Sequence, residues 1–192
     1  MATAGTRDRI VDATAECFRR QGYMATGLKQ IASEADAAFG SLYHFFPGGK
    51  EELGAEVIRW SGRMYMQLFI DIALEESDVV TAVGRFFTDA AKDLEETDYA
   101  DACPIATVAL EVASTSEVLR EACAEVFESW LSSATEYFAG AGIDRDEAHR
   151  LALCMLSLLE GAFIFSRAMR TTEPVLVAGA AAAAAVEDAV HR

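Results

Sequence analysis

Proline, β-branched residues and cysteine are all scarce in this chain of 192 residues. It has 3 prolines, and its 13 Val and 8 Ile are outnumbered by 36 Ala and 15 Leu. Because β-branched side chains are enriched in strands whereas Ala and Leu favour helices, this composition argues against a sheet. We therefore expect an all-α protein.

The four cysteines, Cys17, Cys103, Cys123 and Cys154, are far apart and form no C-x-x-C pair. A chain of this length that is 52% apolar can bury a core without a disulfide framework, so a reducing compartment fits. The first residues lack the apolar stretch of a signal peptide, and the longest nearly uncharged apolar run, 151–165, is too short to cross a bilayer. We predict a cytoplasmic protein with no membrane partner.

Basic side chains are also few, with 16 Lys and Arg against 31 Asp and Glu and a net charge of −15. A uniformly acidic chain would be a poor partner for nucleic acid, because phosphate binding draws on Lys and Arg. The charge is uneven, however. Residues 1–50 hold six basic and five acidic side chains, whereas residues 51–192 hold ten basic and 26 acidic ones. The charge therefore divides the chain near residue 50.

Motifs that carry enzyme chemistry are missing as well. The sequence has no G-x-S-x-G and no G-x-G-x-x-G, and the glycines before Lys50 lack the other residues of a P-loop. Its three histidines, His44, His149 and His191, supply no Glu-x-x-His motif of the kind found in di-iron helical bundles. We therefore predict a protein that is not an enzyme and that has no cofactor or metal site.

Three helices are predicted in the first 50 residues. Apolar residues recur every three or four positions over 7–21, and Gly22 ends that helix. A short second helix follows Thr26, a suitable N-cap, and a third covers 40–46. Two short helices joined by a tight turn after a supporting helix describe a helix-turn-helix, whose second helix enters the DNA major groove.

Six longer helices are predicted in the remainder, which gives about nine in all. Asp78 and Asp144 are suitable N-caps, and Pro104 suits a first helical turn. The predicted ranges are about 50–74, 78–96, 104–113, 116–140, 144–170 and 174–190. The alanine run 178–185 is predicted to be helical and to pack closely on a partner.

The motifs at the first domain are specific. Thr-Gly-Leu-Lys-Gln-Ile-Ala at 26–32, Gly-Ser-Leu-Tyr-His-Phe-Phe at 40–46 and Gly-Lys-Glu-Glu-Leu at 49–53 resemble the TetR family of transcriptional regulators. The Pro-Gly-Gly junction at 47–49 and Cys-Pro-Ile-Ala at 103–106 are more narrowly similar to the branch of LmrA-type efflux repressors. The resemblance implies a helix-turn-helix domain at 1–50 and a larger ligand-binding and dimerisation domain at 51–192.

The resemblance also implies DNA contacts. Tyr43, His44 and the lysines are expected to meet phosphates, which set register but read no sequence. Base reading is expected at the start of the recognition helix, where Ser41 can bond either groove edge and Phe39 suits a thymine methyl. The candidate DNA-binding residues are Thr26, Lys29, Phe39, Gly40, Ser41, Tyr43, His44 and Lys50.

The turn departs from the family pattern. Many members have a small Gly-Val-Ser-like turn, whereas this chain has Asp36, Ala37, Ala38 and Phe39. Asp tolerates the left-handed conformation but brings an anion towards phosphates, and Ala38 cannot cap the next helix, at a cost of about 1 kcal/mol. We expect weaker or more salt-sensitive operator binding than the motif alone implies.

The second domain is implied to hold a ligand pocket and a two-fold interface. Its aromatic and thioether side chains suit an adaptable apolar pocket, although ordinary core packing is the alternative for each. Glu160 lies in an apolar run and must be paired, protonated, or facing a cavity or a partner subunit. The candidate ligand-binding residues are Met64, Phe69, Phe86, Phe87, Cys103, Phe127, Trp130, Glu160 and Phe163.

The resulting hypothesis is a homodimeric repressor that a small, largely apolar molecule releases from a palindromic double-stranded DNA operator. The last two helices are expected to form the dimer as a four-helix bundle. The alternative is a helical small-molecule-binding protein with weakened or lost DNA binding, which the unusual turn at 36–38 keeps open.

Overall fold

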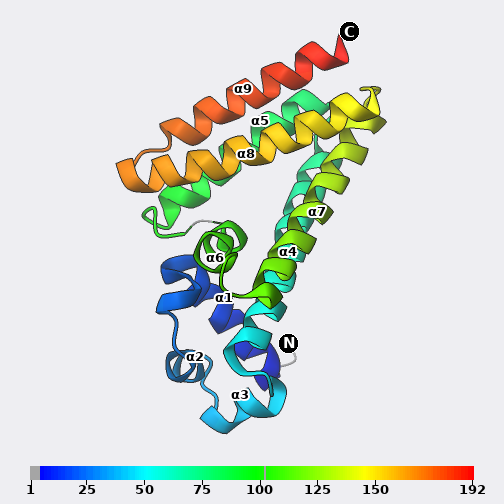
Figure 1. Cartoon of the computed structure of the whole chain (residues 1–192). Coiled ribbons are helices and arrows are strands. Elements are labelled where there is room, and N and C mark those ends of the chain that lie inside the picture. Colours follow the sequence, from blue (N-terminus) through cyan, green and yellow to red (C-terminus); the bar gives the residue numbers. More distant parts are fainter. Residues whose placement is uncertain (1–4, 102) are drawn as a thin grey trace. The chain divides into compact units, whose positions relative to one another are not determined.

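The computed structural model describes residues 5–101 and 103–192, which contain nine α-helices and no strand (Figure 1). The prediction of an all-α fold is therefore confirmed for this part of the chain. The helices are α1 (Thr6–Ala25), α2 (Leu28–Glu34), α3 (Phe39–Phe45), α4 (Gly49–Glu75), α5 (Val79–Glu96), α6 (Pro104–Val112), α7 (Glu117–Gly140), α8 (Arg145–Met169) and α9 (Glu173–Val190).

Local signals fix several helix starts as predicted. The Asp78 carboxylate accepts the Thr81 N–H at 2.8 Å and caps α5. Asp144 accepts the backbone N–H groups of Asp146 and Glu147 and caps α8. Pro104 occupies the first turn of α6, where its missing N–H leaves no helical bond unmade.

The junction between α1 and α2 differs from the prediction. Gly22 has a φ of 79°, but helical structure resumes after it and ends only at Ala25. The N-cap of α2 is Gly27, and no side chain caps it. The hydroxyl of Thr26 instead donates to the Gly22 carbonyl oxygen at 2.6 Å, so Thr26 stabilises the kink in α1 rather than the start of α2.

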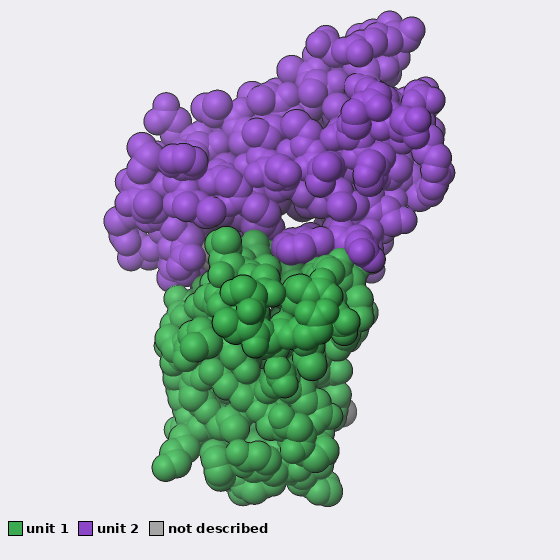
Figure 2. Space-filling view, in the orientation of Figure 1, with its two compact units in different colours: residues 1–63, 103–126 green, residues 64–102, 127–192 purple. Residues whose placement is uncertain are grey.

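The chain packs as two compact units (Figure 2). Unit 1 comprises the described residues up to Arg63 together with Cys103–Val126, and unit 2 comprises Met64–Asp101 and Phe127–Arg192. Unit 1 thus contains α6 and the first parts of α4 and α7 in addition to the three N-terminal helices. The boundaries between the packed units therefore differ from the domain boundary at residue 50 that was expected from the sequence.

The core of unit 1 joins the three N-terminal helices to α6, which packs on α1. Its largest fully buried side chains come from all of these helices and from α4 and α7. They include Ile10, Phe18, Ile31, Leu42, Leu53, Ile58, Ile105 and Leu119. The two short helices are therefore held as one body with their supporting helices.

In unit 2, α9 lies along both α5 and α8 (Figure 1). A Cβ atom placed on Gly179 of α9 would lie 2.5 Å from the Cβ of Phe87 on α5, so the two helices approach closely. The alanine-rich segment is helical as predicted, and it packs on helices of its own chain. Val175, Ala178, Ala182 and Val186 anchor it in the core.

By length and composition alone, α8 is long and apolar enough to cross a membrane. The apolar run 151–165, considered by itself in the sequence, is too short to do so. The helix is longer than that run because it extends from Arg145 to Met169. Core helices of globular proteins pass the same test, and Ala148, Ala152 and Leu159 of α8 are buried in the core of unit 2.

Candidate nucleic-acid interface

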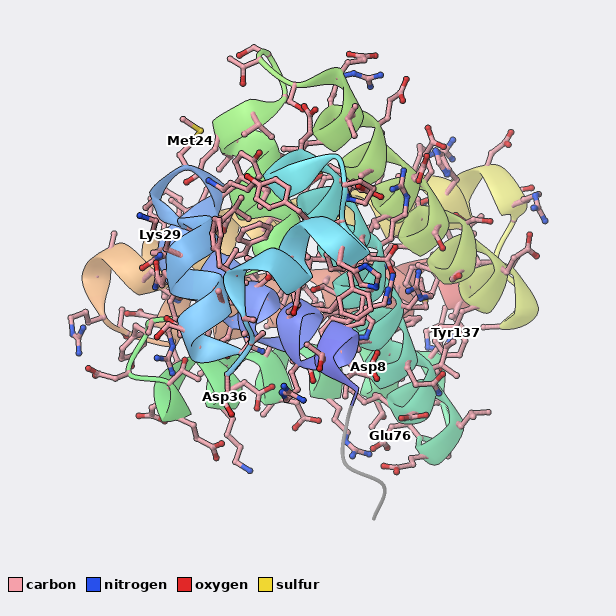
Figure 3. The ribbon with its side chains drawn as sticks, turned by 90° about the horizontal axis from the view of Figure 1, so that it is seen from below. Asp8, Met24, Lys29, Asp36, Glu76 and Tyr137 are labelled. Atoms are coloured by element: carbon pink, nitrogen blue, oxygen red, sulfur yellow. The ribbon has the colours of Figure 1, made fainter. Side chains whose placement is uncertain are left out.

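The tight turn between α2 and α3 depends on Asp36. Its φ of 46° lies in the left-handed region, which Asp adopts at lower cost than most residues. The N-cap of α3 is Ala38, and no side chain caps that helix. The predicted lack of a cap is therefore present in the structure, and the Asp36 side chain is exposed at the turn (Figure 3).

Arg9 of α1 holds this turn in place. Its Nε donates to the carbonyl oxygen of Ala35 at 3.0 Å, and its Nη2 donates to that of Asp36 at 3.1 Å. These carbonyls follow the end of α2, where helical partners are no longer available. This role of Arg9 cannot be predicted from the sequence, because the two carbonyl groups lie 26 and 27 residues away and no spacing rule connects them to Arg9.

A polar network also fixes α2 against α1. The Cys17 thiol donates to Glu34 Oε2 at 3.2 Å, Gln30 donates to Glu34 Oε1 at 2.9 Å, and Gln21 donates to Gln30 at 2.8 Å. Burial, reinforced by the nearby carboxylate, raises the pKa of Cys17 to about 12, so its thiol stays protonated and donates. The bonds from Gln30 and Cys17 lower the pKa of Glu34.

Five candidate DNA-binding residues lie together on α3. Phe39 and Tyr43 are 43% and 49% exposed, and their rings meet edge to face with centroids 5.8 Å apart. His44 and Gly40 are exposed, and Ser41 is half-buried. Leu42, by contrast, is buried and attaches the helix to the unit 1 core. The exposed side of α3 is thus mainly aromatic.

The other three candidates differ from one another. Lys29 is exposed on α2, which leaves its ammonium available to phosphate (Figure 3). Lys50 is half-buried with its Nζ 4.1 Å from the centroid of the Tyr23 ring, and burial lowers its pKa. Thr26 is only 1% exposed, so the hydroxyl expected to meet phosphate is directed into the α1–α2 junction instead.

Three of the candidate ligand-binding residues form one aromatic cluster in unit 2. The ring of Phe69 lies edge to face with Phe86 at 5.5 Å, and Phe86 contacts Phe87 at 6.0 Å. Tyr137, which sequence analysis did not select, joins the cluster 5.6 Å from Phe69. Phe69 and Phe87 are core residues, whereas Phe86 and Tyr137 are half-buried at its edge.

The remaining ligand candidates are dispersed. Phe127 and Trp130 pack edge to face at 5.9 Å on α7. Cys103 belongs to unit 1, where its sulfur accepts the Ala106 N–H at 3.4 Å and caps α6. The others in unit 2 are Met64, which is exposed, and Glu160 and Phe163, which are half-buried on α8. Among the described residues, no three metal-ligating side chains lie together.

The short helices α2 and α3 are held by α1, and α3 exposes aromatic and hydroxyl-bearing side chains. This arrangement defines a helix-turn-helix DNA-binding protein. Residues 10–57 match the family model for bacterial regulatory proteins of the tetR family, and residues 79–181 match the LmrA/YxaF-like C-terminal domain of transcriptional regulators. The chain belongs to the TetR family of DNA-binding transcriptional regulators.

Individual relatives agree with this assignment. The chain is 36% identical to the transcriptional regulator YxaF of Bacillus subtilis, with 90% of each chain covered. It is 30% identical to LmrA of the same organism, with 92% of this chain and 94% of the relative covered. A crystal structure of a TetR regulator from Legionella pneumophila shares the fold with a TM-score of 0.84 at 21% identity, covering 95% of this chain and 97% of that one.

Proposed function

We propose that this regulator is a repressor that a small, largely apolar molecule releases from a palindromic operator in the cytoplasm. The observation that carries the proposal is the presence, in one chain, of a helix-turn-helix unit and a second helical unit with its own aromatic cluster. Repression requires only that the bound protein cover DNA needed by RNA polymerase, so no further domain is necessary.

The half-buried edge of the aromatic cluster suits such an effector. Phe86 and Tyr137 both contact the core ring of Phe69 and remain partly open to solvent. The hydroxyl of Tyr137 is a proton donor at neutral pH, as in any tyrosine, and burial together with Asp78 and Glu76 raises its pKa further above 10. A ligand with an apolar ring and one hydrogen-bond acceptor would match these groups.

TetR-family regulators act as dimers, and we place the dimer interface of this chain on α8 and α9. Both helices carry large apolar side chains that their own unit leaves exposed. These are Leu153, Ile164, Phe165 and Met169 on α8, and Leu176 and Val177 on α9. Because α8 and α9 pack on one another, a partner subunit that covers both helices could bury these side chains. Each protomer would contribute two helices to a four-helix bundle.

The interface is best tested by point substitution. Removing α9 would take Val175 and Ala182 out of the core and unfold the unit, whereas Ile164 is 58% exposed and can change without loss of packing. We expect Ile164→Glu to give monomers in sedimentation experiments. Leu74→Glu, at a 79% exposed position of α4, is the control and should remain dimeric. If the Ile164→Glu protein remained dimeric, the proposed interface on α8 would be wrong.

Release would follow if the ligand favours a spacing of the two recognition helices that no longer matches half-sites one or more DNA turns apart. Taking the operator from nearly full to nearly empty requires the ligand to prefer the non-binding state by about 5 kcal/mol. The coupling must therefore lower operator affinity by several powers of ten at saturation.

Binding and release can be measured separately. Fluorescence anisotropy with DNA from beside the protein's own gene reports operator binding. Trp60 and Trp130 are the only tryptophans, so Trp60→Phe leaves Trp130, about two helical turns before Tyr137 on α7, as a reporter of ligand binding. We expect one class of apolar ligands to change Trp130 emission and to release DNA over the same concentration range.

The two outcomes that contradict the proposal are distinct. Ligand binding without any specific DNA binding would support the alternative, a helical ligand-binding protein whose turn at Asp36 has weakened DNA recognition. DNA binding that no ligand reverses at saturation would leave a regulator without an effector.

A further inference from the structure

The recognition helix α3 lacks the side chains that usually read base pairs. Its sequence is Phe-Gly-Ser-Leu-Tyr-His-Phe, without Arg, Lys, Asn, Gln, Asp or Glu. Those side chains supply the hydrogen bonds that distinguish guanine, adenine and cytosine in the major groove. Hydrogen-bond readout by α3 is therefore limited to the half-buried Ser41, the Tyr43 hydroxyl and the His44 ring.

Instead, α3 presents an ordered aromatic surface. Phe39 and Tyr43 are one helical turn apart, and their rings are inclined at 73° in an edge-to-face pair. The contact restricts both side chains before DNA arrives, which lowers the entropy lost on binding. Gly40, beside Phe39, has no side chain and open space around it, so the backbone can approach a groove closely.

We propose that the Phe39–Tyr43 pair reads the operator through the 5-methyl groups of pyrimidines, which in unmodified DNA means thymine. The proposal rests on DNA binding by this TetR-family regulator and adds the chemistry of its sequence preference. The 5-methyl group is the apolar feature of the major-groove edge of a thymine pair. A cytosine at the same position would place its amino donor against a phenyl ring, where the donor would lose its water without gaining a partner.

The apolar ring and the exposure of Phe39 favour contact with a base over contact with a phosphate. A phenyl ring offers phosphate no hydrogen bond and would displace water from it, at a cost in free energy. Core packing does not account for the residue either, because 43% of it is exposed although Leu42 and Phe46 on the same segment are buried. Burial against a methyl group would recover part of the apolar surface that Phe39 leaves in water.

The test uses the full chain and a duplex selected by it from a randomised pool. Each thymine of the selected duplex is replaced in turn by deoxyuridine, which removes only the methyl group. Burial of one methyl is worth about fourfold in affinity, so we expect about fourfold weaker binding for one half-site and about fifteenfold for the symmetric pair. Replacing the critical thymine pair by 5-methylcytosine paired with guanine should bind more tightly than unmethylated cytosine.

Two variants assign the effect to the aromatic pair. Phe39→Ala should bind thymine and deoxyuridine duplexes equally, because the ring that senses the methyl is gone. Tyr43→Phe should bind both more weakly while keeping their ratio, because it loses only a hydroxyl.

The outcomes separate this proposal from DNA binding itself. A selected duplex that tolerates deoxyuridine at every position, or a Phe39→Ala protein that keeps the full deoxyuridine effect, overturns the methyl readout alone. Failure of the chain to select any duplex overturns both the readout and the regulatory function.

Discussion

At the scale of single residues, Asp36 combines two effects on DNA binding. Its left-handed backbone sets the turn, and its exposed carboxylate lies beside the helix that meets DNA. Asn tolerates the left-handed region as Asp does but carries no charge. The pair Asp36→Asn and Asp36→Gly therefore separates the electrostatic effect from the conformational one.

We expect Asp36→Asn to bind the operator about threefold more tightly at low salt, with the gain disappearing as salt screens the charge. The carboxylate would then make operator binding weaker and less salt-sensitive, so of the two effects expected from the sequence only the weakening follows from its charge. Asp36→Gly should show the same gain and add stability, because glycine adopts positive φ without steric cost. Anisotropy titrations from low to high salt measure the first effect, and urea unfolding measures the second. An unchanged dissociation constant for Asp36→Asn at low salt would contradict a repulsive role for the carboxylate.

Cys17 makes the stability of unit 1 sensitive to alkaline pH. Its pKa is raised from 9.0 to about 12 by burial, so the folded state binds the thiol proton more tightly than the unfolded state. The contribution is complete below about pH 9 and is lost as pH rises towards 12. We expect the free energy of unfolding to fall less between pH 7 and pH 10 in Cys17→Ala than in the parent protein.

Exposed Cys154 provides the control for this measurement. Its thiol meets solvent before and after unfolding, so Cys154→Ala should leave the alkaline decline unchanged. Equal declines in the parent protein and in Cys17→Ala would contradict the linkage to Cys17.

At the scale of helices, the sequence predicts those helix starts that are determined by residues within one turn. Asp78, Asp144 and Pro104 mark helix starts correctly because a cap or a missing N–H acts within one turn. Thr26 was misassigned as a cap because Gly22, four residues earlier, competes for its hydroxyl once α1 kinks. That competition depends on a backbone angle that no local pattern encodes.

Long-range partners were not predictable from one sequence. Glu111 of α6 accepts the Met24 N–H at 2.9 Å across 87 residues, and Arg9 reaches the turn at Asp36 across 27. The motif identified the exposed face of α3, since its residues are contiguous. It did not identify the groups that hold α3 in place, or Tyr137 in the aromatic cluster.

Two glycines of unit 2 test how closely α9 must pack. A Cβ on Gly179 would lie 2.5 Å from Phe87, whereas a Cβ on Gly84 of α5 would meet nothing within 4 Å. We expect Gly179→Ala to destabilise the protein by about 1–3 kcal/mol through overpacking. Gly84→Ala should stabilise it by about 0.5–1 kcal/mol, because alanine loses less entropy in a helix. Thermal unfolding that moves both variants in one direction would contradict this close approach.

At the scale of the whole molecule, the net charge is distributed differently over the two packed units than over the sequence segments 1–50 and 51–192. Unit 1 holds nine basic and 12 acidic side chains, a net charge of −3, and unit 2 holds seven and 19, a net charge of −12. The almost neutral stretch 1–50 therefore belongs to a unit that is itself mildly acidic. An acidic protein of this kind should bind DNA only where cations are locally available.

Most basic groups of the first 50 residues are already engaged. Arg7 pairs with Glu56, and both Arg19 and Arg20 pair with Glu16. Arg9 holds the turn, and the Lys50 ammonium lies over the Tyr23 ring. In the described part of the chain, Lys29 is the remaining cation of this stretch, and it is exposed on α2. Few counterions should therefore be released when the operator binds.

The salt dependence of operator binding measures that number directly. The slope of log K against log salt is about −0.9 for each phosphate neutralised, so one lysine, Lys29, in each protomer of a dimer predicts a slope of about −2. Lys29→Ala should make it shallower by about 2, since each protomer loses one phosphate contact. Lys92→Ala on α5 of unit 2 is the matched control and should leave it unchanged. A slope much steeper than about −6 would mean that the arginines leave their carboxylate partners to meet phosphate.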